Sequence, residues 1–230
     1  MHMHPFLVPR PQEELEMANP IDIWHAEHAY FKQLLDLLHK QIDFFQTGKQ
    51  PNYELMLDII SYLTDYSDKY HHPREDVAFA RMAKHCPDIE LVLARLGQEH
   101  RVIAHLGKTL SKLLNEILGG AIIPRAQVEV AAATYLVYYG NHIAKEEEEI
   151  LTRAARTLTP EDWEAVRNAV PSSHDPLFGD QPEARYQELR RQIAREAQPG
   201  SLYSAFELPE HSLPCVRGRA RVGANPARAR

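Results

Sequence analysis

Four stretches of the chain place apolar residues at alternating spacings of three and four, and this pattern restricts the fold more than any other feature of the sequence. A spacing that averages 3.5 residues is typical of a helix packed in a bundle. Only 10 of the 230 residues are glycine, so the interior holds few helix breakers. The sequence therefore predicts an all-α protein. The first stretch carries the pattern at Trp24, Phe31, Leu35, Leu38, Ile42 and Phe45.

Short segments with glycine or proline separate these stretches. They lie at 47–52, 86–88 and 119–124, and such residues end one helix and start the next. Four long amphipathic helices with short connections form an up-down-up-down four-helix bundle, which we expect over residues 21–170. Pro73 falls inside the second helix and predicts a kink there.

The rest of the chain is expected to form three further segments. Residues 1–20 are rich in proline and lack periodicity, which favours a flexible N-terminal arm. Residues 171–199 carry apolar residues at helical spacing and predict a C-terminal helical extension. Residues 200–230 end in a run that holds five arginines and no acid between 215 and 230, so we expect a disordered basic tail.

Charge and hydropathy argue against several classes of function. The net charge of −6 argues against general binding to nucleic acid or to a membrane surface, and no apolar run approaches the roughly 18–20 residues that span a bilayer. The first residues lack the charged start and apolar core of a signal peptide, which favours a cytoplasmic location. Two distant cysteines beside 13 histidines mean that a metal site would use imidazole and carboxylate ligands, a set that suits iron or zinc.

Histidine replaces an apolar residue once on the seam of each predicted helix. Two of these helices also place a glutamate one turn after the histidine, so that both side chains lie on the same face. The six candidate metal ligands are His28, His71, Glu75, His100, His142 and Glu146. The proline kink leaves His72 open as an extra ligand. In contrast, His25 and His105 fall on polar or flanking stripes, and Asp76 and Glu147 are expected to point away from the seam.

A buried polar cluster of this kind needs compensating partners. A single histidine on a seam is more often a hydrogen-bonded core residue, so the prediction depends on the coincidence of all four helices. Four imidazoles and two carboxylates in one layer are compensated by two divalent cations. In that arrangement Glu75 and Glu146 bridge two metals roughly 3.5–4 Å apart, and the imidazoles are terminal ligands. No residue is assigned a catalytic role.

The candidate ligands occur in four short blocks: Glu27-His28, His71-His72-Pro73-Arg74-Glu75-Asp76, Glu99-His100-Arg101 and His142-Ile143-Ala144-Lys145-Glu146-Glu147. Together these blocks resemble the hemerythrin family, in its bacterial hemerythrin-like (HHE cation-binding) branch, over about residues 20–170. The resemblance implies a four-helix bundle around a non-haem di-iron centre, with two iron ions per chain. It also implies that the two seam glutamates bridge the irons and that the four seam histidines are terminal ligands.

Two positions depart from the oxygen-carrying hemerythrins that the chain resembles. Those proteins have a second histidine four residues after the third-helix ligand and an aspartate five residues after the fourth-helix ligand. Here the first place holds Ala104, and the fourth helix uses Glu146. Fewer imidazoles leave open positions on the metal, which favours reaction with oxygen, peroxide or nitric oxide over reversible carriage. His72 would fill the gap and change this interpretation.

Three functions follow, in order of preference. The first is a non-haem di-iron protein that binds or senses oxygen, redox state or iron, with dioxygen, peroxide or nitric oxide as its small-molecule partner. The second is a di-iron peroxidase or oxidase that removes peroxide or nitric oxide. The third is a regulatory interaction module whose site holds zinc or no metal. Each of the three functions is compatible with a homodimer.

Overall fold

The computed structural model describes residues 19–171, 173–179 and 181–196. The predicted basic tail, and all but the last two residues of the predicted N-terminal arm, lie outside these ranges. Every regular element in the described part of the chain is a helix, which confirms the all-α prediction. None of the described helices is both long and apolar enough to cross a membrane.

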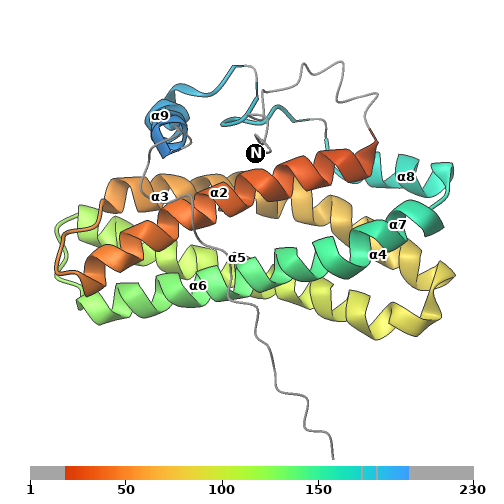
Figure 1. The fold of residues 1–230 in the computed structure, drawn as a ribbon, viewed down its shortest axis with the longest axis horizontal. Coiled ribbons are helices and arrows are strands. Elements are labelled where there is room, and N and C mark those ends of the chain that lie inside the picture. The colour runs from red at the N-terminus through yellow and green to blue at the C-terminus, as the bar shows by residue number, and fades with distance from the viewer. Residues whose placement is uncertain (1–18, 172, 180, 197–230) are drawn as a thin grey trace, which may run out of the picture.

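Four long helical rods lie side by side and form the bundle (Figure 1). The first rod is α2 (Pro20–Gln46), and the third is α5 (Glu90–Leu118), which follows the 3₁₀ turn η2 (Pro87–Ile89). The second rod consists of α3 (Tyr53–Tyr62), the π-helical segment η1 (Leu63–His71) and α4 (His72–His85). The fourth consists of α6 (Arg125–Lys145), the π-helical segment η3 (Glu146–Ile150) and α7 (Leu151–Thr157). α6 packs against α2 and α5, and α5 packs against α3 and α4.

Caps and glycines explain where the rods begin and end. The side chains of Asn19 and Asn52 accept hydrogen bonds from backbone N–H groups in the first turns of α2 and α3, at 3.1 and 3.0 Å. Gly48 and Gly120 lie in two of the turns between rods and have φ angles of 73° and 89°. Glycine adopts such angles without strain, so the turns occur where the sequence predicted them.

Two apolar clusters fill the interior of the bundle. One contains Phe31, Met56, Leu63, Leu110 and Tyr139, and the other contains Trp24, Phe79, Met82, Leu96 and Ile150. Along each rod, the candidate ligands lie at the boundary between the two clusters. The bundle therefore encloses a polar layer that has apolar packing on both sides.

The second and fourth rods change from α to π geometry next to the candidate ligands. η1 ends at His71, and η3 begins at Glu146. A π turn takes in one more residue than an α turn, and such turns are frequent at functional sites. Pro73 lies in the first turn of α4. Where the sequence predicted a kink, the helix is irregular: a π segment ends two residues before the proline.

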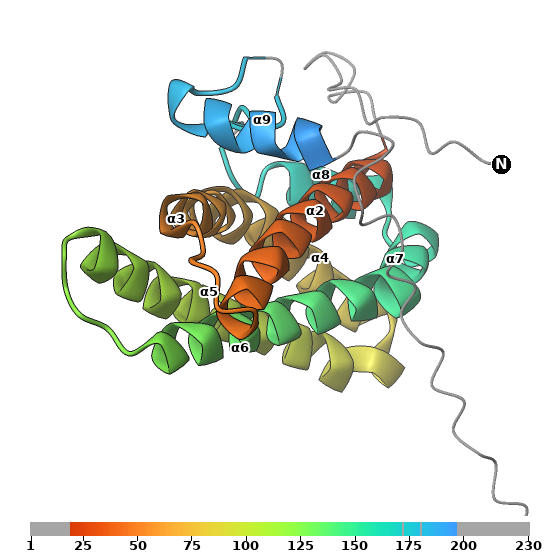
Figure 2. The ribbon, with the colours of Figure 1, turned by 60° about the vertical axis from the view of Figure 1, so that its left-hand side comes forward.

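The chain after the fourth rod covers one end and one side of the bundle. α8 (Pro160–Arg167) starts with a capping box and packs against α4. The segment 171–196 then includes the 3₁₀ turn η4 (Ala184–Tyr186) and α9 (Gln187–Glu196), and α9 lies across α2 and α3 (Figure 2). Among the described residues of this extension, the buried side chains are Leu177, Tyr186 and Leu189. They belong to the same core cluster as Phe31, so the extension is packed onto the bundle.

Candidate metal centre

The six candidate ligands converge in the polar layer, although they come from all four rods. All six are buried, with exposed fractions between 0 and 4%. The Nε2 atoms of His28 and His71 lie 3.1 Å apart. His71 Nε2 also lies 3.1 Å from Glu75 Oε1, and His142 Nε2 lies 3.1 Å from Glu146 Oε1. The histidine and glutamate of each predicted pair therefore point into the same space.

The two glutamates lie between two sets of imidazoles. Glu75 approaches the Nε2 atoms of His28 and His100 at 3.4 and 3.5 Å. Glu146 approaches the same two atoms at 3.5 and 3.6 Å. Each carboxylate thus faces imidazoles on both sides of the layer. This is the placement that a bridging carboxylate requires.

His72 brings a fifth imidazole into the layer and is also buried. Its ring stacks on that of His100, with ring centroids 4.2 Å apart. In two groups of residues, the nitrogen and oxygen atoms that could bind a metal ion lie within 4.8 Å of one another. The first group is His28, His71 and Glu75, and the second is His72, Glu75, His100 and His142. We call the histidines of the first group the His71 side and those of the second group the His100 side. His72, the extra ligand that the sequence left open, therefore lies on the His100 side.

Several polar atoms at the centre of this layer are buried without a hydrogen-bond partner. They are both carboxylate oxygens of Glu75 and of Glu146, and the Nε2 atoms of His100 and His142. An unpaired buried polar group costs about 1–3 kcal/mol, and a charged one costs more. Imidazole nitrogens and carboxylate oxygens are good ligands for divalent transition metals. The donor set therefore fits a metal ion on each side of the layer.

Each imidazole presents its Nδ1 atom to a carboxylate outside the layer. The pairs are His28 with Glu147 at 2.7 Å, His71 with Glu27 at 2.7 Å, His72 with Asp68 at 3.2 Å, His100 with Asp76 at 2.8 Å and His142 with Glu99 at 3.3 Å. For His28, His71, His100 and His142 this contact is a hydrogen bond; an ionised carboxylate only accepts, so Nδ1 carries a proton and Nε2 is the atom directed into the layer. His72 differs, because its Nε2 atom lies 3.2 Å from Ser67 Oγ and burial raises the pKa of Asp68 to about 7. Carboxylates in this position are typical of histidines that bind metals.

The role of these outer carboxylates did not emerge from the sequence. The sequence predicted that Asp76 and Glu147 point away from the seam, because the periodicity of one helix does not show which imidazoles on neighbouring rods a flanking side chain can reach. Glu27 and Glu99 were given no role. Each of the four lies next in sequence to a candidate ligand. An acid beside four of the six candidate ligands is the signal that could have identified them.

The carboxylate behind His71 is enclosed by the protein. Glu27 is 5% exposed and accepts hydrogen bonds from Arg74 Nη2, at 2.6 and 2.9 Å, and from Tyr66 Oη at 2.9 Å. Burial by itself would raise the pKa of Glu27, but the Arg74 charge and the contact with His71 lower this pKa to about 2. The carboxylate is therefore ionised and held by three donors.

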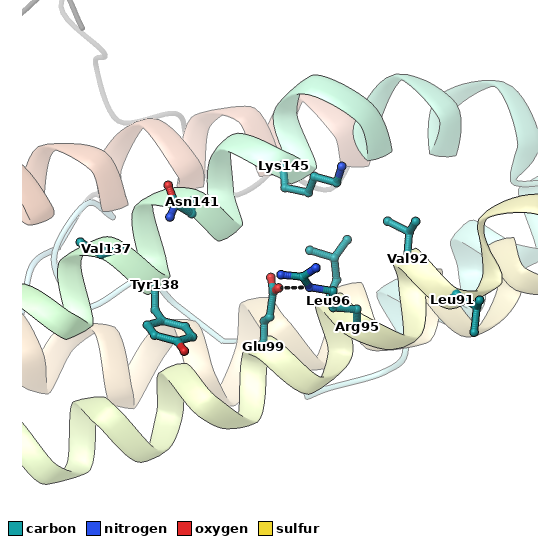
Figure 3. Close-up of a pocket in the computed structure, with 9 residues that line it drawn as sticks. All are labelled: Leu91, Val92, Arg95, Leu96, Glu99, Val137, Tyr138, Asn141 and Lys145. Atoms are coloured by element: carbon teal, nitrogen blue, oxygen red, sulfur yellow. Dashed lines mark hydrogen bonds and ion pairs between the residues drawn. The ribbon is translucent and has the colours of Figure 1, made fainter. Parts of the chain in front are cut away.

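Asp76 and Glu99, two of the carboxylates on the His100 side, lie closer to solvent than Glu27, with side chains 49% and 22% exposed. An open groove of about 670 Å³ runs along α5 and α6 (Figure 3). Its lining comprises Leu91, Val92, Arg95, Leu96, Glu99, Val137, Tyr138, Asn141 and Lys145. Figure 3 shows Glu99 in the space between the two helices, bonded to Arg95 at 2.9 Å. Because Glu99 also contacts His142, a single side chain connects the groove to a candidate ligand.

Negative charge dominates the electrostatics of the layer. Burial by itself would lower the pKa values of His28 and His100, but carboxylates hydrogen-bonded to both rings raise them to about 10 and about 11. Burial would also raise the pKa of Glu75, but the charge of His71 and contacts with the surrounding imidazoles hold it well below its ordinary value. The layer therefore attracts positive charge, as a cation site must.

The other described histidines lie outside the layer, as the sequence predicted for His25, His39, His85, His105 and His174. His25 is 46% exposed in its side chain and contacts Glu147 at 2.7 Å, so it meets the centre only through an outer carboxylate. His211, predicted to lie in a loop or at the surface, is outside the described residues. The structure thus brings together the six predicted ligands and His72.

Comparison with known proteins agrees with this architecture. No curated protein and no solved structure gave a significant match to the chain. The hemerythrin HHE cation-binding domain matches residues 19–154, a range that covers more than half of the chain and includes every candidate ligand. The helical bundle and its buried histidine and glutamate cluster fit a cation-binding domain. The protein therefore belongs to the hemerythrin HHE cation-binding family.

Proposed function

We propose that this chain is a non-haem di-iron protein that binds or senses oxygen, redox state or iron. One observation carries the proposal: five imidazoles, four of them hydrogen-bonded through Nδ1 to carboxylates, surround two buried glutamates whose oxygens lack hydrogen-bond partners. Iron bound there would supply redox chemistry and the capacity to bind small oxygen or nitrogen ligands. Small ligands of this kind are dioxygen, peroxide and nitric oxide.

Each residue of the layer has a role in this proposal. Glu75 and Glu146 would be shared by two ions, His28 and His71 would hold one ion, and His72, His100 and His142 would hold the other. The outer carboxylates keep the Nδ1 atoms protonated and fix the ring orientations. Phe31 contacts the ring of His71 edge-on at 4.9 Å, and Phe79 stacks on His100 at 5.7 Å. These apolar rings limit the access of water to the layer.

The position of His72 supports binding or sensing over turnover. The third rod holds Ala104 where oxygen-carrying hemerythrins have a second histidine, and His72 brings an imidazole to the same side from the second rod. A larger set of imidazoles leaves fewer open positions on the metal. The small molecule would then bind at a restricted place.

A di-iron peroxidase or oxidase that removes peroxide or nitric oxide is the second candidate. The groove along α5 and α6 favours it, because Glu99 connects the groove to His142 and offers small polar molecules a short approach. Sustained turnover with peroxide would support this enzyme. A stable oxygenated spectrum would support the carrier or sensor.

Elemental analysis of protein expressed in iron-replete cells tests the proposal. We expect about two irons per chain, as the paired ligand groups imply, and a near-ultraviolet charge-transfer band that bleaches with dithionite. His71→Ala and Glu146→Ala should lose metal, whereas the surface controls His25→Ala and His105→Ala should keep it. Equal metal loss in all four variants would contradict the ligand assignment. Zinc alone, or no metal, would contradict the iron assignment and favour the regulatory interaction module.

A further inference from the structure

The C-terminal extension reaches the bundle through a half-buried acid, Asp175. Asp175 Oδ2 accepts a hydrogen bond from Tyr62 Oη at 3.0 Å. Asp175 Oδ1 accepts hydrogen bonds from the backbone N–H groups of Leu177 and Phe178, both at 2.8 Å. The side chain therefore joins the turn of the extension to the second rod. Phe178 strengthens the attachment by stacking on Tyr30, with ring centroids 4.0 Å apart.

Tyr62 continues this contact toward the polar layer. Its ring stacks on that of Tyr66, with centroids 5.5 Å apart and an interplanar angle of 16°. Tyr66 Oη donates a hydrogen bond to Glu27 Oε1 at 2.9 Å, and Glu27 Oε2 contacts His71 Nδ1 at 2.7 Å. A continuous line of contacts thus runs from Asp175 on the extension to His71 in the polar layer. All of its side chains except Asp175 are at most 8% exposed.

This line of contacts helps to fix the orientation of the His71 ring. A buried carboxylate keeps its orientation only while its donors stay in place, because unpaired lone pairs are costly in the interior. If Tyr62 loses its partner on the extension, its hydroxyl group is left without this hydrogen bond in the interior, and its ring can shift against the stacked ring of Tyr66. A shift of Tyr66 weakens its hydrogen bond to Glu27, and His71 is then held less firmly.

We propose that Asp175 is a positioning residue, through which the C-terminal extension strengthens metal binding on the His71 side. This inference rests on the proposed metal-binding function. It also predicts an asymmetry, since none of the hydrogen bonds described for Asp76 or Glu99 involves the extension. Loss of Asp175 therefore weakens the binding of one ion and leaves the other unchanged.

The release of iron(II) from the full-length loaded protein tests this inference. The protein is loaded with two equivalents of iron(II) without oxygen, and a coloured iron(II) chelator then reports the rate at which each ion leaves. In Asp175→Asn, one ion should leave on the order of threefold to tenfold faster, less than the 10- to 100-fold typical of direct carboxylate partners. The rate for the other ion should not change.

Three further variants separate positioning from general loosening. Tyr62→Phe keeps the stacked ring but removes the hydroxyl group that bonds to Asp175, so it should reproduce the effect and serves if Asp175→Asn does not fold. Tyr66→Phe should also speed release of one ion, and its effect combined with Asp175→Asn should be less than additive in free energy. Arg185→Gln is the matched control, because Arg185 lies on the same extension and contacts Asp65 at 3.6 Å, outside the line.

Each outcome is decisive. Unchanged release in both Asp175→Asn and Tyr62→Phe would overturn the inference, and so would equal acceleration in Arg185→Gln. Faster release of both ions by the same factor would show that the extension stabilises the whole bundle without positioning His71. A wild-type chain that binds no metal would overturn the proposed function itself. Wild-type binding of two ions with unaltered variants would overturn only the role of Asp175.

Discussion

The His71 side and the His100 side of the candidate centre use the same pairing of imidazole with carboxylate in different surroundings. The two hydrogen bonds are almost equal in length, 2.7 Å to Glu27 and 2.8 Å to Asp76. Glu27 is 5% exposed and is bonded to Arg74. The side chain of Asp76, in contrast, is 49% exposed.

Two hydrogen bonds of almost equal length can therefore differ in how strongly they hold an imidazole in place. A polar contact in the interior is strengthened by the low local dielectric, and its partners cannot be replaced by water without structural change. A contact at the surface is weakened by solvent and salt. We therefore expect His71 to depend on Glu27 more strongly than His100 depends on Asp76.

The largest effect should come from Glu75, because both sides share it. Glu75→Ala removes a ligand from each ion and should reduce the metal content from two ions per chain to nearly none, measured by elemental analysis after gel filtration. His105→Ala, an exposed position on the third rod, is the control and should keep the full content. Retention of one tightly bound ion in Glu75→Ala would show that the two sides are independent.

Glu27→Gln should have the next largest effect and should act on the His71 side alone. The amide cannot accept as strongly from His71 Nδ1, and Arg74 loses its buried counter-charge. Affinity for one ion should fall about 10- to 100-fold, as for other carboxylate partners of metal-binding histidines. Competition with a chelator of known affinity measures this loss.

Asp76→Asn should produce a smaller loss, on the His100 side. Water can replace part of the lost interaction because the position is half exposed, so we expect a decrease in affinity of about two- to tenfold. The loss should also shrink at high salt, where exposed charges are screened. A loss of affinity as large as that of Glu27→Gln would show that the exposure of the outer carboxylate makes no difference.

The smallest effect concerns the glycine that lets Asp76 approach His100. A Cβ atom at Gly97 would lie 3.3 Å from Asp76 Oδ1, so Gly97→Ala should displace the carboxylate slightly and lower affinity by about twofold. Gly140→Ala is the control, since a Cβ atom added there would meet no heavy atom of another residue within 4 Å, apart from its neighbours in the helix. It should leave affinity unchanged and stabilise the protein by about 0.5–1 kcal/mol in thermal unfolding.

The periodicity of the sequence was enough to predict the bundle and the residues that point inward. His28 and His100 occupy seam positions that apolar residues hold one turn before and after, so their burial follows from the pattern. The same periodicity favours His71 and Glu75 over His72 and Asp76 as ligands. The structure places all four residues in or beside the layer. The seam shows which face is buried, but it does not show which neighbouring rod a flanking side chain can reach.

Other features depend on contacts that no local pattern specifies. Asp175 and Tyr62 are 113 positions apart, and their contact requires the extension to fold back over the bundle. Glu147 was expected to turn away, yet it contacts both His25 and His28 across the interface with the first rod. One signal was present for the π segment η1, because Leu63, Ser67, His71 and Glu75 follow one another in steps of four.

Those steps of four give η1 a further importance. In an α-helix each residue turns by about 100°, so three steps of four would rotate Glu75 by roughly 120° from the direction of Leu63. The wider turn of η1 absorbs this angular drift, and both residues are buried. A deletion of one residue inside η1 would leave every ligand in the sequence and still set the two ends of the rod out of phase. The centre is therefore encoded by the number of residues between its ligands as well as by their identity.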